Sequence, residues 1–243
     1  GISSSNVSQI ASATAVRSFL EDYYATSELW TVRRSAQRVL AASNAWLHAH
    51  TMRGDGRFDQ DRGYVCTFSA LILKGRDVHL LHVGDSRIFR LHPQSLEQLS
   101  EDHRVWHASE SYLARALGTG QSLEIDYCHW EASVGDIYLL ATDGAYTHLD
   151  ARVIHDMLAR HPDDLDAAGA ELVQHARDAG SNDDATLQIL RIDELPDDDG
   201  APVQLRRDTL ALPPVLTPGM ECEGFRISRD LQISARSHVH LAV

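Results

Sequence analysis

Apolar residues recur at spacings of three and four in two stretches of the first 50 residues: Val7, Ile10, Ala11, Ala15, Phe19 and Tyr23, then Val32, Ala36, Val39, Leu40, Trp46 and Leu47. This spacing places each set on one face of a helix, so the pattern predicts two amphipathic helices. Asn6 is followed three residues later by Gln9, which predicts a capping box at the start of the first helix.

From about residue 64 to residue 192 the pattern changes to short apolar runs separated by turn signals. The runs read CTFSALILKG (66–75), DVHLLHVG (77–84), RIFRL (87–91), GDIYLLAT (135–142) and ATLQILRI (185–192). Runs of this kind predict strands. Two further helices are expected before the last strand, one over 150–161 with Asp150 as N-cap and one over 166–180 ending on Gly180. This order predicts an α+β fold with antiparallel sheets.

The pattern changes again after Ile192. Residues 193–223 are crowded with acidic, proline and glycine residues and keep no hydrophobic period, which predicts a linker. Residues 224–243 are strand-like once more and stop at Val243 in an apolar run. We therefore expect a first domain over 1–192 and the truncated start of a second domain over 224–243.

Composition and charge argue against several classes of function. The 243 residues suffice for one large domain with an appendage, and no apolar run approaches the length needed to cross a bilayer. The net charge of -13 argues against nucleic acid or an anionic membrane as the main partner, because such partners are bound by clustered Lys and Arg. Cys66, Cys128 and Cys222 show no metal-ligand spacing and leave an odd one over, so we expect a reducing, cytoplasmic setting.

Three short acidic turns stand beside the predicted strands. Asp143 follows an apolar run, Asp183 and Asp184 precede one, and Asp85 lies between two. Taken singly, each has a simple structural interpretation: an Asp-Gly hairpin turn at Asp143, a solvated pair at Asp183 and Asp184, and an ion pair of Asp85 with Arg87. Taken together, carboxylates at sheet ends can converge on hard cations, which prefer oxygen ligands.

The motifs HVGDSRIFRL, LSEDH, ATDGAY and GSNDDAT occur in the order found in PPM-type phosphatases, the metal-dependent protein phosphatase 2C family. CTFSALIL also resembles the strand that precedes GDSR in that family. The resemblance covers about residues 1–192 and implies two antiparallel sheets sandwiched between helix pairs. It further implies a serine/threonine phosphatase that uses two Mg²⁺ or Mn²⁺ ions and a metal-bridging water as nucleophile, with no catalytic protein nucleophile.

The resemblance assigns candidate metal ligands residue by residue. Asp143 matches the metal-binding Asp of the second Asp-Gly motif, Asp183 matches the one in the terminal motif, and Asp85 matches the GDSR aspartate, in an outer shell or at a third metal. Gly1 resembles the glycine whose carbonyl binds a metal. The bridging Asp, an acidic motif and a phosphate-binding Arg would then lie upstream of Gly1, so the domain is expected to lack its first strands.

Three positions depart from the family pattern. Asp184 stands where the family often has Asn, so it is interpreted as an outer-shell or turn residue. Thr147 stands where the family has an acid, which argues against a third metal. Ile2 stands where some members have a His proposed as general acid, so that route for protonating the leaving group is absent.

The 14 histidines form no evident triad with Ser, Cys or Asp. We expect His79, His82, His103 and His107 to serve packing, hydrogen bonding or solvent-facing roles rather than metal binding.

The tail FRISRDLQISARSHVHLAV resembles the first hairpin of a protein kinase, although any hairpin would share its alternation. Leu231 and Val239 match the kinase pattern, whereas Gln232, Ser234 and Ser237 replace its glycines. Side chains there would keep the loop farther from a phosphate. Its place after a linker favours a truncated kinase-like domain.

The leading interpretation is a bifunctional bacterial signalling enzyme, a phosphatase fused to a kinase, whose partners are phosphorylated proteins and its own downstream kinase domain. One alternative within enzymes is a phosphatase of sporulation or stress-response type that acts on anti-sigma antagonists. The alternative of another class is an inactive phosphatase-like regulatory or interaction domain.

Overall fold

The computed structural model describes residues 5–59, 62–93, 95–107, 110–196, 216–222, 224–233 and 238–243. Its contacts divide the chain into two compact units, residues 1–196 and residues 197–243. The boundary falls inside the stretch 193–223, for which the sequence predicts a linker. Residues 197–215 of that stretch lie outside the described part.

The first unit begins with helices, continues with a run of strands and returns to helices before its last strand. Its helices are α1 (Ser8–Tyr24), α2 (Val32–Arg53), α3 (Asp143–Tyr146), α4 (Ala151–Arg160) and α5 (Leu165–Asp178), with a 3-10 turn η1 (Asp55–Arg57) after α2. Its strands are β1 (Phe68–Lys74), β2 (Asp77–Val83), β3 (Arg87–His92), β4 (Ser95–Gln98), β5 (Arg104–His107), β6 (Glu110–Leu113), β7 (Asp126–Glu131), β8 (Ile137–Ala141) and β9 (Leu187–Arg191). The four longer helices and all five strand runs predicted from the pattern are present.

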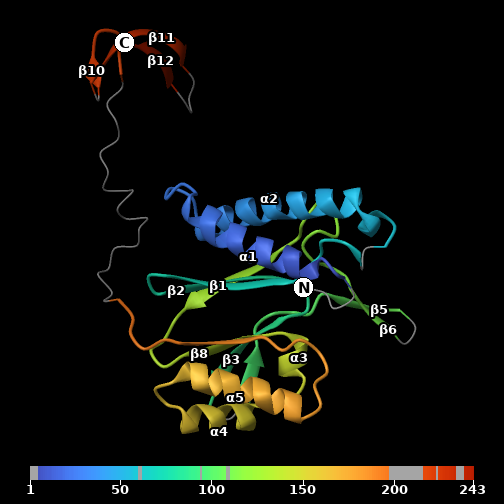
Figure 1. Ribbon diagram of the computed structural model, residues 1–243. Helices are drawn as coiled ribbons and strands as arrows, with labels where there is room; N and C mark the ends of the chain where they lie inside the picture. The colour runs from blue at the N-terminus through green and yellow to red at the C-terminus, as the bar shows by residue number, and fades with distance from the viewer. Residues whose placement is uncertain are drawn as a thin grey trace. The chain divides into compact units, whose positions relative to one another are not determined.

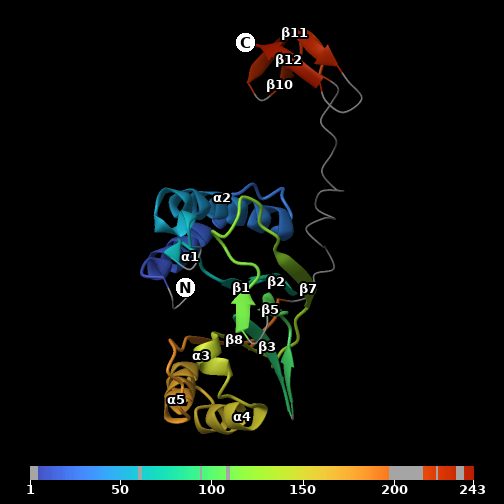
Figure 2. The ribbon, with the colours of Figure 1, turned by 90° about the vertical axis from the view of Figure 1, so that its right-hand side faces the viewer.

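Two antiparallel sheets lie between layers of helices (Figure 1). The first sheet has the order β1-β2-β7 and the second the order β4-β3-β8-β9, while β5 and β6 form a separate hairpin. Helices α1 and α2 cover the outer face of the first sheet, and α4 and α5 cover the outer face of the second, as the perpendicular view also shows (Figure 2). This is the predicted α+β sandwich of antiparallel sheets between helix pairs.

Three apolar clusters hold the four layers together. Phe19 of α1 packs with Leu81 of β2 in the first cluster. Leu172 of α5 packs with Leu139 of β8 in the second. The third surrounds Tyr138, which is fully buried and belongs with residues of both sheets. Because burial of one large apolar side chain stabilises a fold by about 1.5–3 kcal/mol, these clusters fix both sheets and the turns at their ends.

The start of the predicted helix at Asp150 is confirmed. The Asp150 carboxylate accepts a hydrogen bond of 2.8 Å from the amide of Val153, as an N-cap does. The helix predicted over 166–180 is α5, which begins one residue earlier and ends at Asp178. Gly180 follows it with a φ of 102°, a conformation that glycine adopts without strain.

The predicted capping box on α1 is wrong. The helix begins at Ser8 with Val7 as its N-cap residue, and no side chain caps it. Instead, the Ser5 hydroxyl accepts a hydrogen bond of 3.2 Å from the Val7 amide, so the chain turns into the helix one residue later than the pairing of Asn6 with Gln9 requires.

Strands β4, β5, β6 and β7 were not predicted from the hydrophobic pattern. Strand β4 is a four-residue edge strand that reads SLEQ, with a single apolar residue. Strand β7 reads DYCHWE, and all six of its side chains are exposed or half-buried. Such edge strands bury too little surface to leave an apolar run in the sequence, which explains why the pattern misses them.

The second unit contains a small antiparallel sheet with the order β10-β11-β12. Its strands are β10 (Glu221–Cys222), β11 (Phe225–Ile233) and β12 (His238–Ala242). The hairpin predicted for the tail is confirmed, because β11 pairs with β12 from Ile233↔His238 to Ile227↔Ala242. Ser234 and Ser237, two of the positions compared with kinase glycines, lie outside the described residues.

A search of the described residues finds no helix whose length and apolar character would let it cross a membrane.

Candidate functional site

The turn that carries Asp85 joins β2 to β3, and glycine is required next to it. Gly84 has a φ of 120°, and a Cβ at this position would lie 2.4 Å from Cβ of Thr67. No larger residue fits that contact or adopts that backbone conformation easily. The Ser86 hydroxyl lies 2.8 Å from the Thr67 hydroxyl, so the turn is held against the end of β1 on both sides of Asp85.

The Asp85 carboxylate is largely buried and faces Arg104 at the start of β5. Its side chain is 17% exposed, and one carboxylate oxygen lies 3.3 Å from the Arg104 guanidinium. Burial raises the pKa of Asp85, the positive charge of Arg104 opposes that rise, and the negative charge of Asp143 adds to it. Because the charge of Asp143 acts on the Asp85 carboxylate, these two predicted site residues lie near each other.

The sequence-based ion pair between Asp85 and Arg87 is wrong. Arg87 instead forms a double hydrogen bond with Asp102, with its shortest distance at 2.7 Å, and its guanidinium lies 4.0 Å from the centre of the Tyr146 ring. The Tyr146 hydroxyl donates a hydrogen bond of 3.1 Å to the Asp85 backbone carbonyl. Arg87 therefore supports the turn through Tyr146 rather than through the Asp85 carboxylate.

Asp143 does not lie in a hairpin turn, which was its simplest structural interpretation. It is the first residue of the short helix α3, directly after β8, with Thr142 as N-cap. The Thr147 hydroxyl donates a hydrogen bond of 2.6 Å to the Asp143 carbonyl, and the Gly144 amide donates one of 3.0 Å to the Asp143 carboxylate. A helix starting at this point turns the chain away from the sheet and leaves the acid at the sheet end.

The loop of Asp183 packs directly on the start of α3. A Cβ on Gly144 would lie 2.7 Å from the Asp184 carbonyl oxygen and 3.1 Å from the Asp183 carbonyl carbon. The Ser181 hydroxyl donates a hydrogen bond of 2.6 Å to the Gly144 carbonyl, and the Thr142 hydroxyl donates one of 3.0 Å to the Asp184 carbonyl. Asp183 and Asp184 are both exposed, as expected for a polar turn.

Helix α3 thus links the three acidic turns: Gly144 contacts the loop of Asp183, and Tyr146 contacts the turn of Asp85. Gly1, the fourth predicted ligand, lies outside the described residues, as does Ile2. Within the part of the chain that the structure describes, no three His, Cys, Asp or Glu side chains are arranged to hold a metal ion. The metal-ligand roles of Asp85, Asp143 and Asp183 therefore stay predictions.

Sequence analysis missed two residues that hold this site, Arg104 and Tyr146. Tyr146 ends the ATDGAY motif and Arg104 follows LSEDH, so both lie at motifs whose acids carry the sequence signal. Neither residue type by itself signals a contact with Asp85, which lies 19 positions before Arg104 and 61 before Tyr146, and only the fold joins them.

The packing and hydrogen-bonding roles expected for the histidines hold for three of them. His82 and His103 are buried, at 0% and 4% exposed, and both form hydrogen bonds. His79 lies 2.9 Å from the Tyr127 hydroxyl through Nδ1. The side chain of His107 lies outside the described residues.

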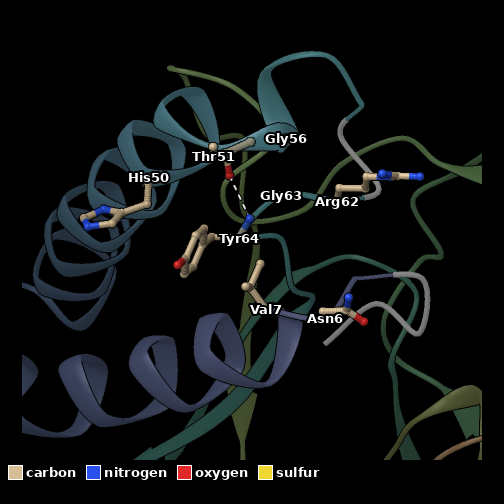
Figure 3. Close-up of a pocket in the computed structure, with 9 residues that line it drawn as sticks. Asn6, Val7, His50, Thr51, Gly56, Arg62, Gly63 and Tyr64 are labelled. Atoms are coloured by element: carbon tan, nitrogen blue, oxygen red, sulfur yellow. Dashed lines mark hydrogen bonds between the residues drawn. The ribbon is translucent and has the colours of Figure 1, made fainter.

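A separate hollow of about 560 Å³ lies between the start of α1, the end of α2 and the chain that follows (Figure 3). Its lining includes Asn6, His50, Arg62 and Tyr64, and none of the predicted acids. The Arg62 side chain is 69% exposed and pairs with Asp59 at 3.4 Å, so its charge is met by solvent and by a neighbour. Among the described residues that line this hollow, no charged side chain is buried, so we assign no ligand to it.

The fold and its acidic turns agree with one protein family. Residues 1–190 match the family model described as protein phosphatase 2C, which is more than half of the chain. The chain belongs to the protein phosphatase 2C family. The family resemblance given by the four sequence motifs is thereby confirmed for the first unit, whereas none of the matches bears on a kinase domain after it.

Curated relatives of this family member are phosphatases of low sequence identity. The serine/threonine protein phosphatase PstP of Mycobacterium tuberculosis is 29% identical over 143 residues, which cover 52% of this chain and 27% of PstP. Protein phosphatase PhpP of Streptococcus pneumoniae is 23% identical over 155 residues, which cover 57% of this chain and 63% of PhpP. The chain therefore spans less than two thirds of either relative.

Solved structures confirm the protein phosphatase 2C fold. The M. tuberculosis phosphatase PstP/Ppp matches with a TM-score of 0.63 at 21% identity, covering 76% of this chain and 83% of that one. The serine/threonine phosphatase of S. agalactiae matches with a TM-score of 0.66 at 22% identity, covering 75% and 81%. A PstP catalytic domain in complex with two manganese ions matches with a TM-score of 0.59 at 22% identity, covering 74% and 79%.

Proposed function

We propose that this chain is a metal-dependent protein serine/threonine phosphatase that hydrolyses phosphoserine and phosphothreonine. The observation that carries the proposal is the junction of three acidic turns on α3, through the contact of Gly144 with the Asp183 loop and the hydrogen bond from Tyr146 to Asp85. Membership of the 2C family and the phosphatase relatives support the same activity.

Asp143 and Asp183 are the residues that would hold Mg²⁺ or Mn²⁺, with Asp85 beside them and the Gly1 carbonyl as a further ligand. Their carboxylate oxygens are the donors that these hard cations prefer, so the donor chemistry fits. The relative solved with two manganese ions supports a pair of ions. Bound there, two ions would activate a water and neutralise charge on the phosphoryl oxygens.

The protein's own groups prepare this site for a phosphate ester. Burial disfavours the ionised carboxylate of Asp85, and the neighbouring charge of Arg104 offsets part of that effect. Tyr146 fixes the backbone of the same turn, and Gly144 leaves room for the Asp183 loop because it carries no side chain. Each acid is thus held by contacts that do not depend on a bound ion.

We also propose that the parent protein is a cytoplasmic, bifunctional kinase/phosphatase of bacterial type, which acts on phosphorylated proteins and on its own downstream kinase domain. The β11–β12 hairpin supports this, with Leu231 and Val239 at positions that resemble the kinase pattern. The gene sequence after Val243 tests it. A lysine-bearing third kinase strand is expected there, and a different sequence would refute the kinase half.

The test of the phosphatase is Mn²⁺-dependent release of phosphate from a phosphothreonine peptide. Three proteins are compared: this chain, a version extended by the residues encoded upstream of Gly1, and the extended version with Asp143→Asn. Asp156→Asn, at an exposed position on α4, serves as the matched control because it removes the same charge away from the acidic turns.

We expect hydrolysis by the extended protein and by its Asp156→Asn control, with a loss of at least about a hundredfold in Asp143→Asn. A folded extended protein without activity would instead support the regulatory, non-enzymatic interpretation. Full activity in Asp143→Asn would show that hydrolysis does not use this site.

A further inference from the structure

Two buried histidines converge on the backbone of a single residue, Gly84, directly before Asp85. The Gly84 amide donates a hydrogen bond of 3.1 Å to Nδ1 of His103, and its carbonyl accepts one of 2.8 Å from the His103 amide. The same carbonyl lies 3.0 Å from Nε2 of His82. Both polar groups of this residue are therefore satisfied by the two histidines.

The hydrogen bonds fix where each ring of the pair carries its proton. Nδ1 of His103 accepts from the Gly84 amide, so its proton is on Nε2, which donates a hydrogen bond of 2.8 Å to Asp126. The second oxygen of Asp126 accepts a hydrogen bond of 3.0 Å from Arg115. The orientation of His103 is thus set by a charged pair at the start of β7.

His82 is the same tautomer, with its proton on Nε2, but it has different partners. A carbonyl only accepts, so Nε2 of His82 carries the proton and donates to Gly84, and Nδ1 accepts from the Ser69 hydroxyl at 2.9 Å. Burial and the neighbouring His103 lower the pKa of His82 to about 4, which keeps this ring neutral. The centroids of the two rings lie 5.0 Å apart, so the rings support the Gly84 backbone from adjacent positions.

Simple filling of the core does not account for this arrangement. A buried imidazole must be hydrogen-bonded to offset its lost hydration, and an apolar side chain fills a similar volume without that requirement. Here all four ring nitrogens of His82 and His103 have partners, and one nitrogen of each ring is directed at the same residue. The two rings therefore hold the Gly84 backbone in place as well as filling the core.

We propose that His82 and His103 are positioning residues that fix the backbone of Gly84 on both sides of its Cα, and thereby the direction of the Asp85 carboxylate. The inference rests on the proposed phosphatase function, because only then does the direction of that carboxylate matter for metal binding. Neither histidine contacts substrate or metal in this account. Their effect reaches the site through Gly84, whose φ of 120° admits no alternative residue.

Two polar variants of His103 separate positioning from a general structural role. In His103→Asn the side-chain oxygen replaces Nδ1, so it keeps the acceptor for the Gly84 amide and loses the donor to Asp126. In His103→Gln the terminal amide replaces Nε2, so it keeps the donor to Asp126 and leaves the Gly84 amide unpaired. Both replace a buried ring by a smaller polar group, so they form a matched pair.

Two readouts are measured on the chain extended upstream of Gly1. The first is hydrogen exchange of the amides at 84–86 in metal-free protein, with β8 amides as the reference for global stability. The second is the Mn²⁺ concentration for half-maximal phosphatase activity. We expect His103→Gln to accelerate amide exchange at 84–86 about tenfold and to raise the Mn²⁺ concentration for half-maximal activity about tenfold. In His103→Asn we expect both the exchange rate and this Mn²⁺ concentration to stay within about threefold of wild type.

Equal effects of the two variants on either readout, or unchanged exchange in His103→Gln, would overturn the positioning role. If the wild-type protein shows the expected amide exchange but no hydrolysis, the phosphatase function is overturned. The exchange rates of the two variants then still decide the positioning role. If His103→Gln does not fold, Asp126→Ala replaces it, because it removes the acceptor that orients the His103 ring. Unchanged exchange in Asp126→Ala would overturn the inference.

Discussion

Gly144 and Asp184 touch so closely that a Cβ on Gly144 would lie 2.7 Å from the Asp184 carbonyl oxygen. The contact joins the first turn of α3 to the loop before β9, two segments about 40 residues apart in the sequence. It is reinforced by the hydrogen bond of 2.6 Å from the Ser181 hydroxyl to the Gly144 carbonyl. The distance between the Asp143 and Asp183 carboxylates therefore depends on the absence of a side chain at Gly144.

Gly144→Ala is expected to separate the two turns. The added methyl group meets backbone atoms that cannot rotate away, so the loop must shift, at a cost of about 1–3 kcal/mol in the free energy of unfolding. We expect the Mn²⁺ concentration for half-maximal activity to rise at least about tenfold. Gly169→Ala on α5 is the control, since its Cβ would make only ordinary contacts at 3.9 Å. Similar effects in both variants would contradict the account.

Asp183 and Asp184 are adjacent, both exposed, and predicted to differ in role. Asp183→Asn is expected to reduce Mn²⁺-dependent hydrolysis at least about a hundredfold, because it removes a predicted ligand, whereas Asp184→Asn is expected to stay within about threefold. Both variants lose one charge from the same loop, so each controls for the other. A larger loss in Asp184→Asn would show that the ligand was assigned to the wrong residue.

Stability is expected to fall between about pH 6.5 and pH 4 because of His82. Burial lowers the pKa of His82 from 6.5 to about 4, so the unfolded chain takes up its proton first as the pH falls. The contribution of the neutral ring is fully present above pH 6.5 and is lost as the pH falls toward 4, by up to about 3 kcal/mol. Urea unfolding at pH 7 and pH 4.5 measures this loss.

His82→Gln tests the assignment of this pH dependence. The variant is expected to be less stable than wild type at pH 7 but to lose less stability on going to pH 4.5, since the titrating ring is gone. His129→Gln, at an exposed position on β7, should keep the wild-type loss. If His82→Gln loses as much stability as wild type over this range, another group is responsible.

Much of the fold could be predicted because its main elements bury wide apolar faces. Helices α1 and α2 and strands β2 and β8 carry such faces, and residues such as Leu40 and Leu139 mark them in the sequence. Strands β4 to β7 bury little apolar surface, because they pair at sheet edges or in a small hairpin. Their sequences therefore show no clear alternation of apolar and polar residues. The start of α1 was misjudged because Ser5, outside the assumed motif, bonds the Val7 amide.

The candidate site could be predicted only as a set of separate acidic turns. Motifs identify Asp85, Asp143 and Asp183 because each lies at a strand end in a short, recognisable sequence. The contacts between turns depend on partners distant in sequence, such as Arg104 for the Asp85 carboxylate and Tyr146 for its carbonyl. These contacts depend on how the β5–β6 hairpin and α3 come to lie beside the turn between β2 and β3, which local pattern does not encode.

The central claim is that the acidic turns joined by α3 hold two metal ions. Calorimetric titration of Mn²⁺ into the chain extended upstream of Gly1, with and without Asp143→Asn, tests it most directly. The account predicts two bound ions in the wild-type protein and loss of the tight binding in Asp143→Asn. Absence of tight binding in the folded wild-type protein, or unchanged binding in Asp143→Asn, would contradict it.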